Sequence, residues 1–188
     1  MSRLADIPIP EDLIARARAG DEAAQARIYR ALAPAVFALV RRLVGNRAVA
    51  EDLFQDTMIA FYEKLDSYRG VAPLGAWARQ IAISKCLMYL RSPWQRARLQ
   101  MDRLDPESVG RAVSDPSPET LDVERALGSL SATARTVVWL YEVEGYSHQE
   151  IAQAFGRTVS FSKSQLARAH LRLRHWFEPQ DGQGQPCT

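Results

Sequence analysis

The segment from Gly145 to Arg174 constrains the fold of this chain more than any other. Ser147 is followed three residues later by Glu150, the capping-box pattern that begins a helix, and Gly156 supplies the permissive backbone of a tight turn. Apolar residues recur at helical spacing on both sides of that turn: Ile151, Ala152 and Phe155 before it, then Val159, Leu166, Ala169 and Leu173 after it. The pattern predicts a helix-turn-helix.

The second of these predicted helices is strongly basic. The cations of this stretch are Arg157, Lys163, Arg168, Arg172 and Arg174. No acidic residue follows them until Glu178. A helix with one apolar edge and an uninterrupted positive face suits the major groove of DNA and its phosphates. An ordinary helical hairpin with a solvated basic face is the alternative at this point.

Charge alternates in blocks along the 188 residues, although the net charge is only +2. Residues 51–66 are acidic, residues 79–98 hold basic side chains and no acid, and residues 101–124 are acidic again. Such alternation indicates separate surfaces for separate partners. A solvated helix face remains the alternative for any single block.

Several classes of protein are disfavoured. Two cysteines and three scattered histidines have no ligand-like spacing, so we expect neither a metal site nor a cofactor. The sequence has no motif with catalytic spacing, and we expect His148, His170 and His175 at exposed helical positions, which argues against an enzyme. We find no signal-peptide core and no apolar run of about 20 residues, so we expect a cytoplasmic protein without membrane insertion.

Helical periodicity dominates outside the middle of the chain, and strand signals are nearly absent. Helices are expected over residues 13–19, 23–32, 34–44, 48–65, 76–91, 121–130 and 132–143, followed by the helix-turn-helix. We therefore predict an all-α fold of two small helical domains, 8–98 and 122–178, the second a helix-turn-helix domain. The Pro-, Ser- and acid-rich stretch 99–121 is expected to be a flexible linker, and 179–188 a disordered tail.

Two parts of the chain resemble a known family. The string AEDLFQDTMIAFYEKLDSYRG (Ala50–Gly70), followed by AWARQIAISKCLMYLR (Ala76–Arg91), resembles region 2 of bacterial extracytoplasmic-function (ECF, group IV) sigma factors, and Leu127–Arg174 resembles region 4. The two motifs stand in the family's order and cover most of the chain. The resemblance implies a non-enzymatic, alternative sigma factor that binds core RNA polymerase and directs promoter recognition, DNA melting and transcription initiation.

The resemblance also implies site residues. Those for polymerase binding are Glu51, Asp52, Gln55 and Asp56. Those for the −10 promoter element are Tyr68, Arg69, Arg79, Gln80, Ser84, Lys85 and Tyr89. Those for the −35 element are Arg157, Ser160, Phe161, Lys163, Ser164, Gln165, Arg168 and Arg172. Trp77, beside the −10 set, is expected in the core.

The predicted recognition helix departs from the family pattern. Ser160 stands in place of a glycine, Phe161 of a threonine, Ser162 of an apolar residue and Gln165 of an arginine. Glutamine pairs with adenine where arginine favours guanine, so we expect an unusual −35 sequence. Ser162 interrupts the apolar edge, and Phe161 is expected to turn inward to fill the gap. A degenerate motif that binds DNA weakly is the competing interpretation.

Promoter DNA, core RNA polymerase and an anti-sigma factor or other regulator are the partners that the resemblance implies. Phosphorylation at Thr57 or Ser67, which flank the acidic helix, is an open regulatory question. Two rival functions remain at this stage: a stand-alone helix-turn-helix regulator and a pure interaction protein. Co-purification with polymerase and salt-sensitive DNA binding would discriminate them.

Overall fold

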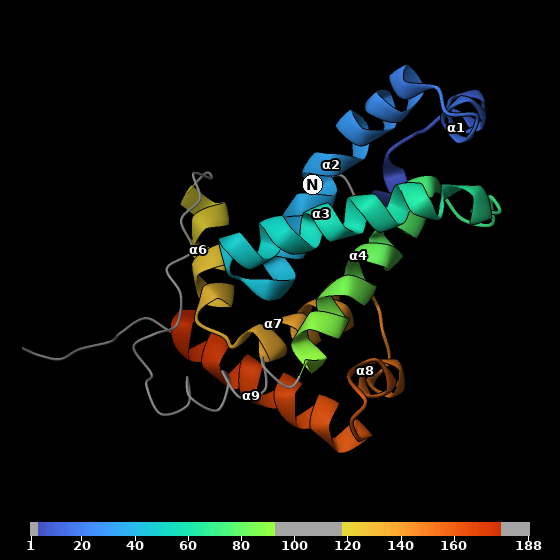
Figure 1. The fold of residues 1–188 in the computed structure, drawn as a ribbon. Coiled ribbons are helices and arrows are strands. Elements are labelled where there is room, and N and C mark those ends of the chain that lie inside the picture. Colours follow the sequence, from blue (N-terminus) through green and yellow to red (C-terminus); the bar gives the residue numbers. More distant parts are fainter. Residues whose placement is uncertain (1–3, 93–117, 178–188) are drawn as a thin grey trace, which may run out of the picture.

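The computed structural model of the protein describes residues 4–92 and 118–177, and this part of the chain contains helices and no strand (Figure 1). The elements of residues 4–92, the first half, are η1 (Leu4–Asp6), α1 (Glu11–Arg18), α2 (Glu22–Val44), α3 (Arg47–Glu63), η2 (Leu65–Ser67) and α4 (Leu74–Arg91). Those of residues 118–177, the second half, are α6 (Pro118–Gly128), α7 (Ala132–Val138), the π-helical turn η4 (Trp139–Val143), α8 (His148–Phe155) and α9 (Val159–Phe177). The all-α prediction is confirmed.

Three helices form the centre of the first half. α2, α3 and α4 pack against one another, α1 packs on α2, and η1 packs on α4. Ile28 and Leu32 of α2, Phe61 of α3 and Ile83 of α4 are fully buried between them. Burying side chains of this size stabilises the fold by roughly 1.5–3 kcal/mol each.

The prediction that a helix ends before Pro34 and a new one begins there is wrong, since α2 is continuous from Glu22 to Val44. Proline inside a helix costs about 3 kcal/mol through a lost hydrogen bond and a steric clash. Here Pro34 lies on the exposed side, whereas Leu32 and Val36 beside it continue one buried stripe. Burial of that stripe outweighs the cost of the proline.

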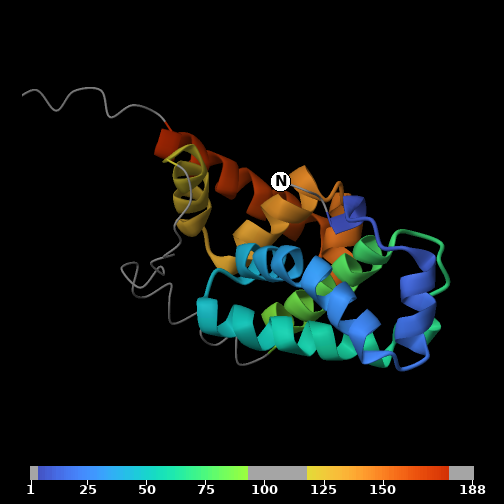
Figure 2. The same ribbon diagram turned by 90° about the horizontal axis from the view of Figure 1, so that it is seen from above.

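The two halves pack directly on each other. α7 lies against α2, α8 approaches the end of α4, and buried side chains of both halves form one continuous apolar core (Figures 1 and 2). Periodicity did not predict this contact. The predicted tail and most of the predicted linker lie outside the described residues, and α6 begins at Pro118, three residues before the predicted start of that helix.

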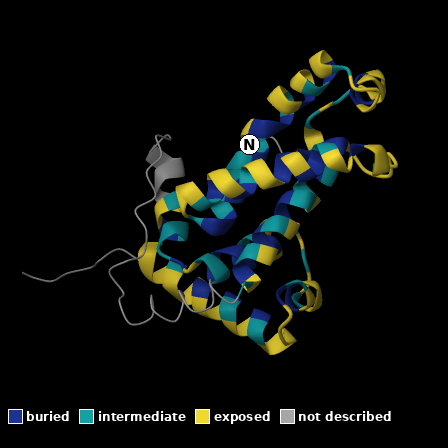
Figure 3. Cartoon of the chain, in the orientation of Figure 1, coloured by how far each residue is buried: buried dark blue, intermediate teal, exposed yellow. Residues whose placement is uncertain are grey.

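The outer faces of α3 and α9 are exposed. α3 and α9 lie at opposite edges of the molecule in Figure 2, and Figure 3 shows exposed positions along both. The fold therefore presents two well-separated helical surfaces on one compact frame.

Candidate polymerase and nucleic-acid interfaces

The first surface is the acidic face of α3. The Asn46 side chain accepts a hydrogen bond from the Val49 amide at 3.1 Å and so begins the helix. The inward side of α3 buries Leu53, Met58 and Phe61 in the core. All four residues predicted for polymerase binding are exposed on the outward side: Glu51, Asp52, Gln55 and Asp56. Their shared exposure gives α3 one polar, negative outer surface.

Sequence reasoning missed one member of this face. Ile59 lies one turn beyond Gln55 and Asp56, and its side chain is 58% exposed. An exposed isoleucine next to carboxylates offers a partner an apolar contact beside a charged rim. Helical spacing from Asp52 and Asp56 places Ile59 on this face, but an isoleucine is expected in the core when only the sequence is known.

The loop before α4 is held by packed aromatic rings. Trp77 lies between Phe61 and Tyr68, with ring centroids 5.3 and 5.4 Å away. The Tyr68 hydroxyl donates to the Ala72 carbonyl at 2.6 Å, and the Arg18 guanidinium lies over the Tyr68 ring. Trp77 is half-buried and packs against the core, as expected, while Arg69 is exposed. The loop is thus a braced support that leaves one cation accessible.

The remaining residues predicted for −10 binding lie along α4. Gln80 and Ser84 are exposed, whereas Arg79, Lys85 and Tyr89 are half-buried. Sequence reasoning missed Met88, which is 64% exposed. It lies one turn beyond Ser84 and extends the exposed row that starts at Gln80. A polarizable, flexible thioether can pack on bases, but neither charge nor aromaticity marked this residue.

The helix-turn-helix is present as α8 and α9. Both reciprocal hydrogen bonds of the Ser147–Glu150 capping box are made. Gly156 ends α8 at φ 61°, a left-handed backbone that favours glycine. The Thr158 hydroxyl accepts from the Phe161 amide at 3.3 Å and helps to begin α9. The capping box and the turn were both predicted from the sequence.

The two helices are joined through a buried polar contact. Ser162 of α9 is fully buried, and its Oγ lies 3.0 Å from His148 Nδ1 of α8. The His148 ring is half-buried and stacks on Tyr141 with ring centroids 4.6 Å apart. The expectation that all three histidines are exposed is wrong for His148. The Phe161 ring is half-buried and lies 5.7 Å from the Phe155 ring, which agrees with the inward position expected for it.

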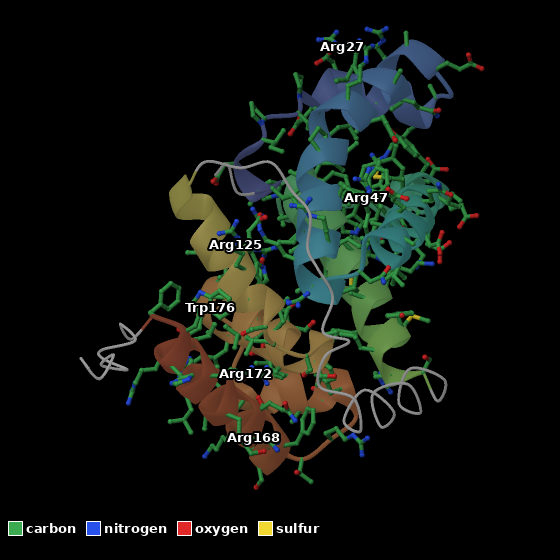
Figure 4. The ribbon with its side chains drawn as sticks, turned by 90° about the vertical axis from the view of Figure 1, so that its left-hand side faces the viewer. Arg27, Arg47, Arg125, Arg168, Arg172 and Trp176 are labelled. Carbon is green, nitrogen blue, oxygen red and sulfur yellow. The ribbon has the colours of Figure 1, made fainter. Side chains whose placement is uncertain are left out.

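The outer face of α9 and the turn before it carry the predicted −35 residues. Those exposed are Arg157, Ser160, Lys163, Ser164, Arg168 and Arg172, and those half-buried are Phe161 and Gln165. Arg168 and Arg172 lie along α9, away from Arg47 at the start of α3 (Figure 4). Arg168 Nε donates to the Ser164 carbonyl at 3.1 Å, which holds the stem of that side chain along the helix. The result is a positive, accessible helical face.

The α4 row also meets the second half. Arg79 Nη1 lies 2.6 Å from Glu144 Oε2, the Tyr146 hydroxyl donates to Gln80 Oε1 at 3.0 Å, and Arg91 Nη1 donates to the Ala154 carbonyl at 3.3 Å. Glu144 and Tyr146 lie between η4 and α8. Two residues predicted for −10 binding therefore have partners within the chain.

No group of three or more His, Cys, Asp or Glu side chains within residues 4–92 and 118–177 is arranged to hold a metal ion. None of the helices in these two ranges combines the length and the apolar character needed to cross a membrane.

Each half of the chain matches a known protein family. Residues 28–96 match the family Sigma-70 region 2, and residues 120–173 match Sigma-70, region 4. Together the two matched segments make up most of the chain.

Curated relatives carry a consistent description. The chain is 31% identical over 170 residues to the ECF RNA polymerase sigma factor SigE of Mycolicibacterium smegmatis, covering 84% of this chain and 64% of that relative. The chain thus spans slightly less than two thirds of SigE. It is 26% identical over 179 residues to the ECF RNA polymerase sigma-E factor of Escherichia coli (strain K12), covering 89% of this chain and 93% of that relative.

One solved structure similar to this chain is a sigma factor bound to its anti-sigma factor. It is the sigma factor RpoE in complex with the anti-sigma factor NepR from Bartonella quintana, 25% identical, with a TM-score of 0.49, covering 82% of this chain and 97% of that one. The two family matches, in order along one chain, and the curated relatives lead to one assignment. The chain belongs to the extracytoplasmic-function RNA polymerase sigma factors, a family of transcription initiation factors rather than enzymes.

Proposed function

We propose that this chain binds core RNA polymerase through the acidic face of α3 and duplex promoter DNA through α9. The observation that carries the proposal is the separation of the two surfaces. An exposed acidic row on α3 and an exposed basic row on α9 lie at opposite edges of one frame (Figure 2). A sigma factor must hold polymerase and DNA at the same time, so it needs two such surfaces that do not compete.

On the polymerase side, Glu51, Asp52, Gln55 and Asp56 would meet a basic surface of the enzyme, and Ile59 would add apolar contact. Charge complementarity at such a rim sets orientation and association rate more than affinity. Polymerase acts in the cytoplasm, and we place this chain there. We also propose that an anti-sigma factor or another regulator controls it, on the ground of the family alone.

On the DNA side, residues 122–178 would form the −35-binding domain. The first turns of α9, with Ser160, Ser164 and Gln165, would reach base edges, while Lys163, Arg168 and Arg172 would hold phosphates. Arg157 lies in the turn before α9, where it can reach the phosphate backbone.

Residues 8–98 would form the domain that binds polymerase and the −10 element, with 99–121 as its linker to the −35-binding domain. Tyr68, Arg69 and the α4 residues Arg79, Gln80, Ser84, Lys85 and Tyr89 would bind the −10 strand once it is melted. Aromatic and basic side chains suit single-stranded DNA, because bases stack on rings and phosphates pair with cations. No chemistry is required of the protein. Capture of unstacked bases offsets the free energy of opening the duplex.

Run-off transcription with purified core polymerase on a pool of genomic promoters tests the proposal. Wild type is compared with Asp52→Ala/Asp56→Ala and with Glu11→Ala/Asp12→Ala, a matched control that removes two exposed acids from α1. We expect transcripts that start downstream of a shared two-part sequence, that fade in the α3 variant and persist in the α1 control. DNA binding without polymerase, no co-elution with polymerase and no transcripts would instead identify a stand-alone regulator.

A further inference from the structure

We propose that the structure is a closed form of the protein, in which the second half occupies the face of α4 that binds the −10 strand, with Glu144 in the place of a DNA phosphate. The inference rests on the proposed function, because it takes α4 as the −10 surface. It adds an internal competitor for that surface, located between η4 and α8.

The contact with Arg79 is the centre of the closed form. The Glu144 side chain is 6% exposed and the Arg79 side chain 31%, so the pair is largely shielded from water. Glu144 Oε1 also accepts from Trp139 Nε1 at 3.1 Å, which fixes the carboxylate. A carboxylate held 2.6 Å from a guanidinium nitrogen occupies the position that a phosphate oxygen would take.

The pair is nevertheless incompletely bonded. Arg79 Nε and Glu144 Oε2 are both buried without a hydrogen-bond partner among the described residues. The 2.6 Å approach is therefore a charge contact without hydrogen-bond alignment. A buried guanidinium nitrogen that lacks an acceptor costs free energy, which a ligand with more acceptor oxygens would recover. A phosphate group is such a ligand.

Two weaker contacts extend the competition along α4. Tyr146 donates to Gln80 at the start of the exposed row, and Arg91, at the end of α4, donates to the Ala154 carbonyl, so both ends of this stretch of α4 contact the second half. Ser84 and Met88 between them remain exposed. DNA lying along this row would have to displace the segment from Glu144 to Tyr146.

The other two predicted surfaces stay accessible in the closed form. The acidic face of α3 and the basic outer face of α9 are exposed, and neither takes part in the Arg79 or Gln80 contacts. Polymerase and the −35 duplex can therefore be bound before the halves separate. The −10 surface becomes available last, which would keep the free protein from binding single-stranded DNA.

Paired measurements on the full chain test this inference. Donor and acceptor dyes are attached to cysteines introduced at two exposed sites, Glu63→Cys and Ala167→Cys, and energy transfer between the dyes reports the separation of the halves. The native thiol of Cys187 is removed by Cys187→Ser, and the native Cys86 is buried. Binding of a labelled 20-nucleotide single strand of mixed sequence reports access to α4. The variants are Glu144→Gln, which keeps an acceptor for Trp139, Tyr146→Phe, Arg79→Gln and the control Glu142→Gln. Glu142 is a half-exposed acid that pairs with His170 of the same half.

We expect Glu144→Gln to lower energy transfer and to strengthen strand binding about five-fold, since apparent affinity follows the competent fraction. Tyr146→Phe should act in the same direction but less, and Glu142→Gln should do neither. Arg79→Gln should open the halves without the gain in binding, because it also removes the DNA contact. The inference is overturned if Glu144→Gln leaves energy transfer unchanged, or if Glu144→Gln opens the halves without binding the strand more tightly. If either result occurs while wild-type run-off transcription is normal, the closed form is wrong but the sigma function is not. Absence of wild-type transcription would instead contradict the sigma function itself.

Discussion

The Thr136 hydroxyl donates to the Leu43 carbonyl at 2.9 Å, across 93 positions of sequence and between two fully buried residues. Leu43 belongs to the last turn of α2, where carbonyls lack partners within the helix. Thr136 of α7 thus supplies a hydrogen-bond donor to one of the unpaired carbonyls at the end of α2, in the other half of the molecule. The halves are joined by a specific polar contact as well as by apolar packing.

Thr136→Val is expected to destabilise the protein by about 1–3 kcal/mol, because it keeps the shape of the side chain and leaves the buried Leu43 carbonyl without a donor. Urea unfolding followed by circular dichroism measures this. Thr133→Val, on the same helix but only half-buried, is the matched control and should change little. Equal effects of the two variants would show that the hydrogen bond to Leu43 contributes nothing.

Gly45→Ala is expected to destabilise the protein more than Gly20→Ala. Both glycines have positive φ, 76° and 87°, and alanine in this region costs about 1–2 kcal/mol. A Cβ at Gly20 meets nothing within 4 Å, but one at Gly45 would lie 1.6 Å from Arg135 Nη1. The difference between the two thermal unfolding midpoints isolates that contact. Matching midpoints would mean that the guanidinium moves aside without cost.

Arg135 has little freedom to move. Its side chain donates to the carbonyls of Leu127, Gly128 and Leu130, at 2.8, 3.2 and 3.1 Å, and so closes the end of α6. Burial lowers the pKa of this arginine from its ordinary value. Displacement by a new methyl group would break those bonds, which is why we expect a cost at Gly45 beyond backbone strain.

Local signals predicted local structure well. The Ser147–Glu150 capping box marks a helix start that the structure confirms, because it depends on residues within one turn. Pro34 misled for the same reason. Its local preference was outweighed by a buried stripe on α2, and the size of that burial is set by helices distant in sequence.

The contact between the halves could not be predicted from sequence. From the sequence, Glu144 and Tyr146 are expected to be ordinary surface residues at the end of a helix. Their partners on α4 lie about 65 positions away in the sequence, too far for any local pattern to indicate the contact. Ser162 read as an interruption of an apolar edge, and only the structure places His148 against it. Ile59 and Met88 were not predicted as surface residues, because hydrophobic periodicity does not distinguish an exposed apolar side chain from a buried one.

Ser162→Ala is expected to destabilise the helix-turn-helix by about 1–3 kcal/mol, because the half-buried His148 Nδ1 would lose its partner. Ser164→Ala serves as the control, since Ser164 is exposed and its hydroxyl donates only to the Phe161 carbonyl of its own helix. Chemical unfolding of both variants, followed by near-ultraviolet circular dichroism, makes the comparison. A smaller loss at Ser162 than at Ser164 would contradict the structural role given to the His148 contact.

Thr57→Asp is expected to unfold or severely weaken the first half, which bears on phosphorylation. Thr57 is fully buried, and its hydroxyl donates to the Leu53 carbonyl at 2.6 Å, so an acid there would be an uncompensated charge costing about 3 kcal/mol or more. Ser67→Asp, at an exposed site, should leave the melting temperature nearly unchanged. A folded Thr57→Asp variant with altered polymerase binding would restore Thr57 as a regulatory site.

Glu150→Gln is expected to flatten the dependence of stability on pH in the acid range. Hydrogen bonds from the Ser147 amide and hydroxyl lower the pKa of Glu150 below its ordinary 4.5. A carboxyl with a depressed folded-state pKa stabilises the protein above its unfolded-state pKa and loses that contribution as pH falls through the folded-state value. The wild-type free energy of unfolding should therefore fall more steeply than that of Glu150→Gln between about pH 5 and pH 3, where a neutral glutamine keeps the cap throughout. Urea unfolding at half-unit pH steps measures both curves, with the exposed Glu63→Gln as a control outside any cap. If the Glu150→Gln curve ran parallel to that of wild type, the capping box would carry no pH-dependent stability.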